Sequence, residues 1–111
     1  MVLLNNNVKY VVAKPGDTYV TLAKDLEMGL WQLRKYNETG KNEILNSGDL
    51  VYLQPKRRRS RTEQHVVKKG ETIYSISQLY AVKMKFIRKK NHLGPGEEPQ
   101  EGDVINLRKN K

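Results

Sequence analysis

The chain has 111 residues, of which 37% are hydrophobic, and it carries a formal net charge of +9 at pH 7. It contains no cysteine, which excludes both a disulfide framework and a thiolate metal site. No stretch approaches the roughly 18 consecutive apolar residues that a membrane-spanning helix needs, so no transmembrane span is expected.

The first predicted element is a strand, because residues 8–13 form the apolar, β-branched run "VKYVVA". Gly16 then turns the chain, and Thr18 stands where its hydroxyl can cap the start of a helix. The helix itself is predicted by an apolar stripe with i, i+3, i+4, i+7 spacing, which comprises Tyr19, Leu22, Ala23 and Leu26.

A second short helix is predicted from about Leu30 to Tyr36. Asn37 follows it, and asparagine often ends helices because it tolerates the left-handed conformation. After a polar loop, "SGDLVYLQ" at residues 47–54 predicts a Gly-Asp turn into a last strand. The first and last strands can pair only with each other. We therefore expect a two-stranded antiparallel sheet covered by two helices.

The same pattern occurs again, displaced by 54 residues from Gly16 to Gly70, and no gap is needed as far as Gln54 and Arg108. Self-similarity at a fixed period marks a repeated structural unit. The fold class is therefore predicted to be α+β, with a first repeat at residues 8–55 and a second repeat at residues 63–109. Identical pairs include Thr18/Thr72, Arg34/Arg88, Asn37/Asn91, Gly48/Gly102 and Asp49/Asp103.

A basic run, "KRRRSR", lies between the repeats and contains five basic residues within residues 56–61. Such a run can be a nuclear signal or a nucleic-acid-binding arm. Its position at the repeat boundary, directly after Pro55, instead favours a solvated and self-repelling linker. We therefore assign residues 56–62 to a basic linker.

Both repeats resemble a known family at specific residues. The segment "YVVAKPGDTYVTLAKDLEMGLWQLRKYN", with "ILNSGDLVYLQP" after it, resembles the lysin motif, or LysM module, and "HVVKKGETIYSISQLYAVKMKFIRKKN" with "EGDVINLR" is similar to a second one. The shared features are an aromatic residue or His before two valines, Gly-Asp/Glu-Thr, the Asn after the second helix, and Gly-Asp before the last strand. The resemblance implies a βααβ fold that binds N-acetylglucosamine-containing glycans in peptidoglycan or chitin.

The resemblance also implies a glycan site at the start of the first helix of each repeat. First-turn N–H groups lack partners within the helix and can donate to a sugar hydroxyl or an acetamido carbonyl, and glycine lets a ligand approach the backbone. The loop that follows the second helix of each repeat, here called the facing loop, would pack on the N-acetyl methyl group; in the first repeat it carries Ile44 and Leu45. The alternative for each residue is a structural role in a turn, a cap or the core. The predicted glycan-binding residues are Gly16, Asp17, Thr18, Tyr19, Ile44, Leu45, Gly70, Glu71, Thr72, Ile73 and Pro99.

The second repeat departs from this pattern in its facing loop. Glu98 and Pro99 stand where the first repeat has Ile44 and Leu45. Lys90 also stands where the first repeat has the apolar Tyr36. Pro99 still offers an apolar face, but the acidic loop is expected to prefer another ligand or none. We therefore expect the second repeat to bind glycan less well than the first.

Other chemistry-bearing residues point to no further site. Trp31 is either a partly exposed helix residue or a stacking contact, and His65 and His92 lack a nearby carboxylate cluster, so no metal or cofactor is expected. His65 is interpreted as a strand residue near solvent. Glycoside hydrolysis uses two carboxylates, and the only repeat-matched pairs, Asp17 with Asp49 and Glu71 with Asp103, have turn or cap explanations.

The resemblance implies a non-catalytic tandem module that targets a cell-wall protein or hydrolase to peptidoglycan, with a hydrolase such as a glucosaminidase or amidase as the expected attached enzyme. We expect a monomer that acts outside the cytoplasm, in the envelope or secreted, and whose basic linker also attracts anionic wall polymers. The start "MVLLNNN" lacks the features of a signal peptide, which suggests a fragment of a longer protein. The alternative is a basic scaffold that binds an acidic partner or nucleic acid.

Overall fold

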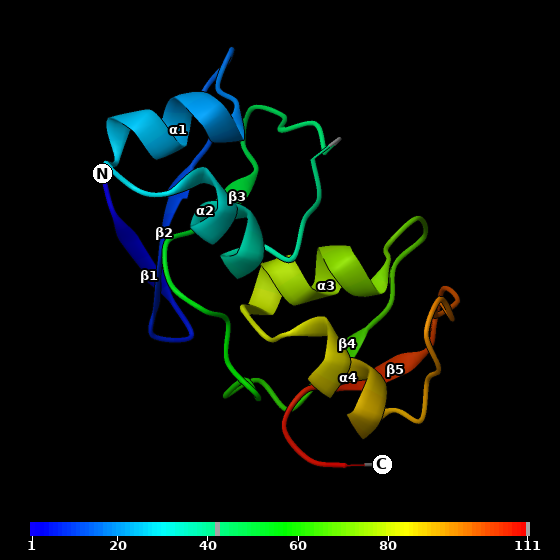
Figure 1. Cartoon of the computed structure of the whole chain (residues 1–111). Coiled ribbons are helices and arrows are strands. Elements are labelled where there is room, and N and C mark those ends of the chain that lie inside the picture. Colours follow the sequence, from blue (N-terminus) through cyan, green and yellow to red (C-terminus); the bar gives the residue numbers. More distant parts are fainter. Residues whose placement is uncertain (42, 111) are drawn as a thin grey trace. The chain divides into compact units, whose positions relative to one another are not determined.

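The computed structural model describes residues 1–41 and 43–110. It divides into two compact units, unit 1 (Met1–Lys56) and unit 2 (Arg57–Lys111). Each unit contains two short helices and a small sheet, which are labelled in Figure 1. The elements in chain order are β1 (Leu3–Asn5), β2 (Val8–Val12), α1 (Tyr19–Asp25), α2 (Leu30–Tyr36), β3 (Leu50–Tyr52), β4 (Gln64–Val66), α3 (Ile73–Tyr80), α4 (Met84–Lys90) and β5 (Val104–Asn106).

Unit 1 is built on an antiparallel sheet in which β2 lies between β1 and β3. The pairing of β2 with β3 places Val11 opposite Val51, and both side chains are buried. Alternate residues of these strands therefore face the helices. The core that joins the sheet to α1 and α2 contains Val11, Ala13, Tyr19, Leu22, Ala23, Leu33 and Val51.

Strand β1 was not expected from the sequence. It forms a hairpin with β2 through Asn6 and Asn7, which have φ values of 53° and 59°. Asparagine is favoured where a two-residue hairpin turn requires positive φ. The side-chain amide of Asn5 donates to the Tyr52 hydroxyl at 2.9 Å, and burial raises the pKa of that tyrosine to about 12. The sheet of unit 1 consequently has one strand more than the predicted pair.

Unit 2 has the predicted two-stranded sheet, with β4 antiparallel to β5. Helices α3 and α4 pack on it through a core of Val67, Ile73, Ile76, Val82, Ile87, Ile105 and Leu107. The α+β fold class and the βααβ order are therefore confirmed. Within the part of the chain that the structure describes, no helix is both long and apolar enough to cross a membrane.

The predicted helix caps are confirmed in both units. Thr18 and Thr72 have extended backbone conformations, and each side-chain oxygen accepts a 3.1 Å hydrogen bond from the backbone N–H of Thr21 or Ser75. The hydroxyls of Thr21 and Ser75 accept bonds of 2.9 Å from the cap N–H groups in return. A hydroxyl residue thus takes the place that glutamate usually has in a capping box.

The expected reason for Asn37 and Asn91 was wrong. Neither is left-handed, with φ values of −97° and −115°; the left-handed residues are the next ones, Glu38 and His92. Each buried asparagine instead connects α2 or α4 to a strand. The Asn37 amide donates to the carbonyls of Leu33 (2.8 Å) and Tyr52 (2.9 Å), and its oxygen accepts from the Tyr52 N–H at 2.7 Å.

The basic run, expected to be a solvated linker over residues 56–62, is exposed at residues 57–59, 61 and 62 but buried at Lys56 and Ser60. The Lys56 side chain is fully buried in unit 1, and its Nζ lies 2.8 Å from a Glu38 carboxylate oxygen. Burial lowers the pKa of Lys56, and Glu38 opposes that shift. Arg57 belongs to unit 2, since its N–H donates to the Ala81 carbonyl at 2.8 Å, and the Ser60 N–H donates to Leu107 at 3.0 Å. The boundaries of the repeats themselves remain a prediction.

Candidate functional site

The turn before α1 is set by the backbone of Gly16. Its φ of +86° is a conformation that favours glycine, and a Cβ atom added there would meet no other atom within 4 Å. The space above this turn is therefore open. The Asp17 carboxylate accepts a 2.8 Å hydrogen bond from the Lys14 N–H, so its first role is to stabilise the turn.

The turn before α3 repeats this geometry around Gly70, which has a φ of +84° and equally open space. The Glu71 carboxylate accepts a 2.6 Å hydrogen bond from the Lys68 N–H. Because glutamate is one methylene longer than the matched Asp17, Oε1 also reaches Nε2 of His65 at 2.8 Å. The two turns thus share a backbone but differ in the contacts of their carboxylates.

His65 lies on β4 as expected, but it is buried rather than near solvent. Its Nδ1 lies 2.7 Å from the Tyr80 hydroxyl. An ionised carboxylate can only accept hydrogen bonds, so Nε2 donates to Glu71, and in the neutral imidazole Nδ1 accepts from Tyr80. The first repeat has Tyr10, Asp17 and Leu26 at the matched positions, which cannot form this network.

The network changes the acidity of two groups. Burial raises the pKa of Glu71, but hydrogen bonds from the Lys68 N–H and from His65 outweigh it, so the pKa lies below its ordinary value of 4.5. Burial raises the pKa of the Tyr80 hydroxyl, and the nearby charge of Glu71 adds to the effect. Glu71 is therefore held in its ionised form at the edge of the predicted glycan site.

The helix starts offer the ligand backbone rather than side chains. The side chains of Tyr19 and Ile73 are buried in the cores of their units. Thr18 and Thr72 remain exposed, with their hydroxyls engaged in the caps. Any contact that Tyr19 or Ile73 makes with a glycan must therefore use main-chain atoms.

The facing loop of unit 1 presents an apolar side chain to solvent. Its end is joined to the Gly16 turn by two 2.8 Å hydrogen bonds that Ala13 makes with Gly48 and Asp49. The Ile44 side chain is 80% exposed, which excludes the alternative that it is a core residue. Leu45 is partly buried and packs against the core. Ile44 is thus available to a ligand, while Leu45 supports the loop.

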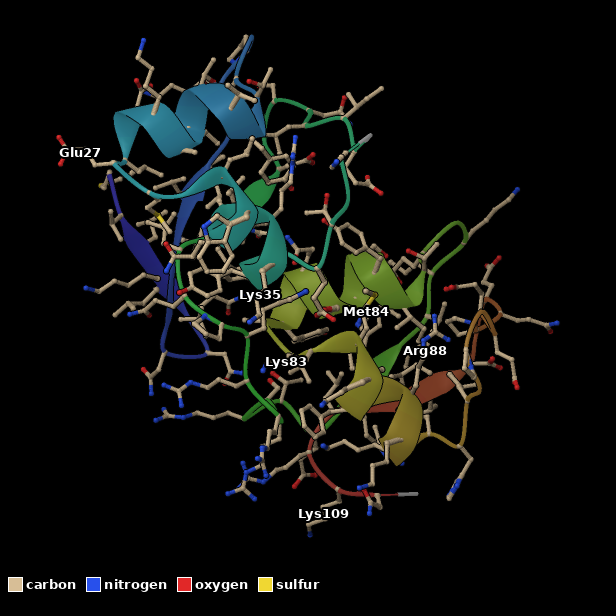
Figure 2. All side chains as sticks on the ribbon, viewed as in Figure 1. Glu27, Lys35, Lys83, Met84, Arg88 and Lys109 are labelled. Atoms are coloured by element: carbon tan, nitrogen blue, oxygen red, sulfur yellow. The ribbon has the colours of Figure 1, made fainter. Side chains whose placement is uncertain are left out.

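The facing loop of unit 2 closes on its own helix. Oε1 of Glu98 accepts a 2.8 Å hydrogen bond from the N–H of Ile73, the first residue of α3. The other carboxylate oxygen lies 3.3 Å from Nη2 of Arg88. Figure 2 labels Arg88 on α4, from which its guanidinium also donates to the carbonyls of Gly94 (3.0 Å) and Glu97. Pro99 follows this contact and is partly buried.

This contact was missed by the sequence reasoning, which treated Glu98 as a loss of apolar surface in an acidic loop that would prefer another ligand or none. Arg34 and Arg88 occupy the same position in both repeats, but only the second repeat has a carboxylate ten residues after the arginine. That difference was the available signal. The matched Arg34 of unit 1 has a buried Nε that finds no hydrogen-bond partner among the residues that the structure describes.

The remaining polar candidates have structural roles. Asp49 and Asp103 accept 2.9 Å bonds from the N–H groups of Asn46 and Gln100, as their turn assignment predicted. Trp31 is 71% exposed on α2. Among the described residues, no three His, Cys, Asp or Glu side chains come together in a way that could hold a metal ion.

Comparison with known proteins identifies the repeats. The LysM domain matches residues 11–53 and 65–108. Two solved structures are similar: the spore cortex-lytic enzyme SleL of Bacillus cereus, with 23% identity and a TM-score of 0.40, and SleL of Bacillus megaterium QM B1551, with 19% identity and a TM-score of 0.40. The alignments cover 94% and 90% of this chain but only 23% and 22% of those chains.

The chain therefore spans less than a quarter of the length of either enzyme. Among curated protein sequences, none matches it. The LysM domain is a glycan-binding module of cell-wall-associated proteins and not a catalytic one. Its two matches include the Gly16 and Gly70 turns and the facing loops of both units. The chain belongs to the LysM family and contains two LysM domains in tandem.

Proposed function

We propose that the chain is a non-catalytic targeting module that holds a cell-wall protein, such as a peptidoglycan hydrolase, on N-acetylglucosamine-containing glycan. The observation that carries the proposal lies in unit 1, where the space at the Gly16 turn before α1 is open and Ile44 is exposed on a loop whose end is hydrogen-bonded to Ala13. Peptidoglycan outside the cytoplasm is the proposed target, and chitin is the other polymer with the same sugar.

The chemistry suits an N-acetylated sugar. Backbone N–H groups at a helix start can donate to an acetamido carbonyl, and the partial positive charge there favours an acceptor. Ile44 can cover the acetamido methyl or the apolar C–H face of the ring. A shallow site of this kind buries little ligand surface, so a single unit should bind weakly and specificity should come from the acetamido group.

The test is co-sedimentation of the chain with purified peptidoglycan, and in parallel with chitin, at low and high salt. The proposal predicts that soluble N-acetylglucosamine oligomers release the chain from the polymer, and that binding persists at high salt. Release by salt alone, with no effect of the oligomers, would show electrostatic adsorption instead of sugar recognition. Binding to chitin but not to peptidoglycan would change the proposed target while keeping the sugar.

A second candidate is the binding of anionic wall polymers, which a cluster of cations on unit 2 favours. The ring of Phe86 has Lys85 at 5.1 Å and both Arg58 and Lys90 at 5.5 Å from its centre. Burial lowers the pKa of Lys90, and the neighbouring charges of Arg59, Lys89 and Arg58 lower it further. A polyanion placed there would relieve the repulsion within the cluster.

The double variant Lys85→Gln/Lys89→Gln tests this second activity. It should reduce the salt-sensitive part of wall binding and leave displacement by soluble oligomers unchanged. Equal loss of binding to nucleic acid and to phosphate-containing wall polymers would mean that the cluster attracts any polyanion.

A further inference from the structure

The Ile73 N–H of unit 2 is one of the backbone donors that the predicted glycan site would use. It is the first residue of α3, so its N–H has no acceptor within the helix. The Ile73 N–H instead donates a 2.8 Å hydrogen bond to the carboxylate of Glu98, which lies 25 residues further along the chain. A carboxylate is also favoured there by the partial positive charge of the helix start.

Arg88 holds the Glu98 carboxylate in place. It pairs with the second carboxylate oxygen at 3.3 Å and donates to two carbonyls of the same loop. The Glu97 carboxylate adds a 3.1 Å bond from the Gly94 N–H. The loop is thus connected to α4 by the arginine and to α3 by Glu98, so removing Glu98 from Ile73 requires breaking charged contacts.

Unit 1 has a different residue at the matched position of its facing loop. Ile44 stands at the position of Glu98 and has no oxygen in its side chain, although Arg34 is present at the position of Arg88. Ile44 is exposed instead of folded onto the helix start. The Ile44 side chain therefore cannot make the contact that the Glu98 carboxylate makes with Ile73.

We infer that Glu98 is an intramolecular competitor for the glycan site of unit 2, and this inference rests on the function proposed above. The acetamido carbonyl of a sugar is a neutral acceptor, whereas Glu98 is tethered beside the same N–H and paired with Arg88. A tethered group competes at a high effective concentration. Unit 2 therefore binds N-acetylglucosamine oligomers only after Glu98 has left Ile73, and this contact lowers the affinity of unit 2.

The contact can be tested first without sugar, by residue-resolved NMR of the full chain. The substitution Glu98→Ile installs the residue of unit 1 and should move the Ile73 amide proton resonance upfield, because its charged acceptor is lost. Glu101→Ile changes an exposed acid of the same loop and should leave that resonance in place. Glu98→Gln, which keeps the size of the side chain, serves if Glu98→Ile does not fold.

The same samples are then titrated with the N-acetylglucosamine pentamer. In the natural chain, the amides of Thr72 and Ile73 should reach half-saturation at a concentration about tenfold higher than those of Thr18 and Tyr19, the difference expected for losing one charge-assisted hydrogen bond. Glu98→Ile should bring the midpoint of unit 2 close to that of unit 1, which itself should not change. Glu101→Ile should behave as the natural chain.

Three results would overturn the inference. If Glu98→Ile leaves the Ile73 amide unmoved in the sugar-free protein, the contact does not exist. If the contact is lost but the midpoint of unit 2 does not fall while unit 1 still titrates, Glu98 is not a competitor and the proposed function stands. If no amide of either unit responds to the pentamer in any variant, the proposed function fails, and the inference fails with it.

Discussion

Units 1 and 2 share the residues that build the fold and differ in the residues that surround the helix starts. Both have a threonine cap, a left-handed glycine and a buried asparagine between helix and strand. In unit 1 the facing loop exposes Ile44, whereas in unit 2 it bonds Glu98 to Ile73. The same βααβ scaffold therefore presents different loop side chains in its two copies.

The largest expected effect concerns the shared asparagines. Asn37→Ala should destabilise unit 1 by about 3 kcal/mol, because it leaves the buried N–H and C=O of Tyr52 without their side-chain partner. Asn91→Ala should destabilise unit 2 by a similar amount through Asn106. Amide hydrogen exchange of the full chain reports each unit separately. A loss below about 0.5 kcal/mol in either unit would break the comparison at its shared framework.

The threonine caps should have a smaller and again matched effect. Thr18→Ala and Thr72→Ala should each cost about 1 kcal/mol in their own unit, since each removes the acceptor for the N–H of Thr21 or Ser75. The corresponding serine variants keep the acceptor and should restore most of the stability. A smaller loss from Thr72→Ala than from Thr18→Ala would mean that the Glu98 contact stabilises the start of α3 when the cap is removed.

The smallest expected effect separates the units by pH. The folded-state pKa of Glu71 lies below its ordinary value of 4.5, so its contribution to stability is present above about pH 4.5 and is lost as the pH falls through the folded pKa. Unit 2 should therefore lose stability over this acid window, and Glu71→Gln should reduce that loss without changing unit 1. Thermal melting followed by NMR at pH 6 and pH 4 is the measurement. An acid response of unit 2 that Glu71→Gln leaves unchanged would place its origin elsewhere.

The sequence was sufficient for features with a local signature. The stripe of Tyr19, Leu22, Ala23 and Leu26 lies next to Thr18, so helix and cap could be predicted together. Strand β1 could not, because its three residues are too few to show a period. The hydrogen bonds that connect Arg57 and Ser60 to unit 2 use backbone atoms. Any residue except proline can donate such a bond, so the sequence does not indicate it.

The site was harder to predict because its contacts join distant residues. Ile73 and Glu98 are 25 residues apart, and Asn37 lies 15 residues from the strand residue that it binds. Alignment of the repeats showed that Glu98 replaces Ile44, but only the three-dimensional structure brings Glu98 to the N–H of α3. The burial of His65 follows likewise from partners on two other segments, Glu71 and Tyr80.

The central proposal, that unit 1 is the stronger glycan site and that Glu98 weakens unit 2, is tested most directly by a matched pair of glycine variants. Gly16 and Gly70 have φ values of +86° and +84° and equally open surroundings, so valine introduces the same backbone strain at both. The measurement is co-sedimentation of the full chain with purified peptidoglycan, on variants whose circular dichroism matches that of the natural chain.

Gly16→Val should weaken binding about tenfold, and Gly70→Val should change it by less than about twofold, because a side chain at Gly16 blocks the site in use while Glu98 already fills the other. Equal losses from the two substitutions, or a loss confined to Gly70→Val, would contradict the account.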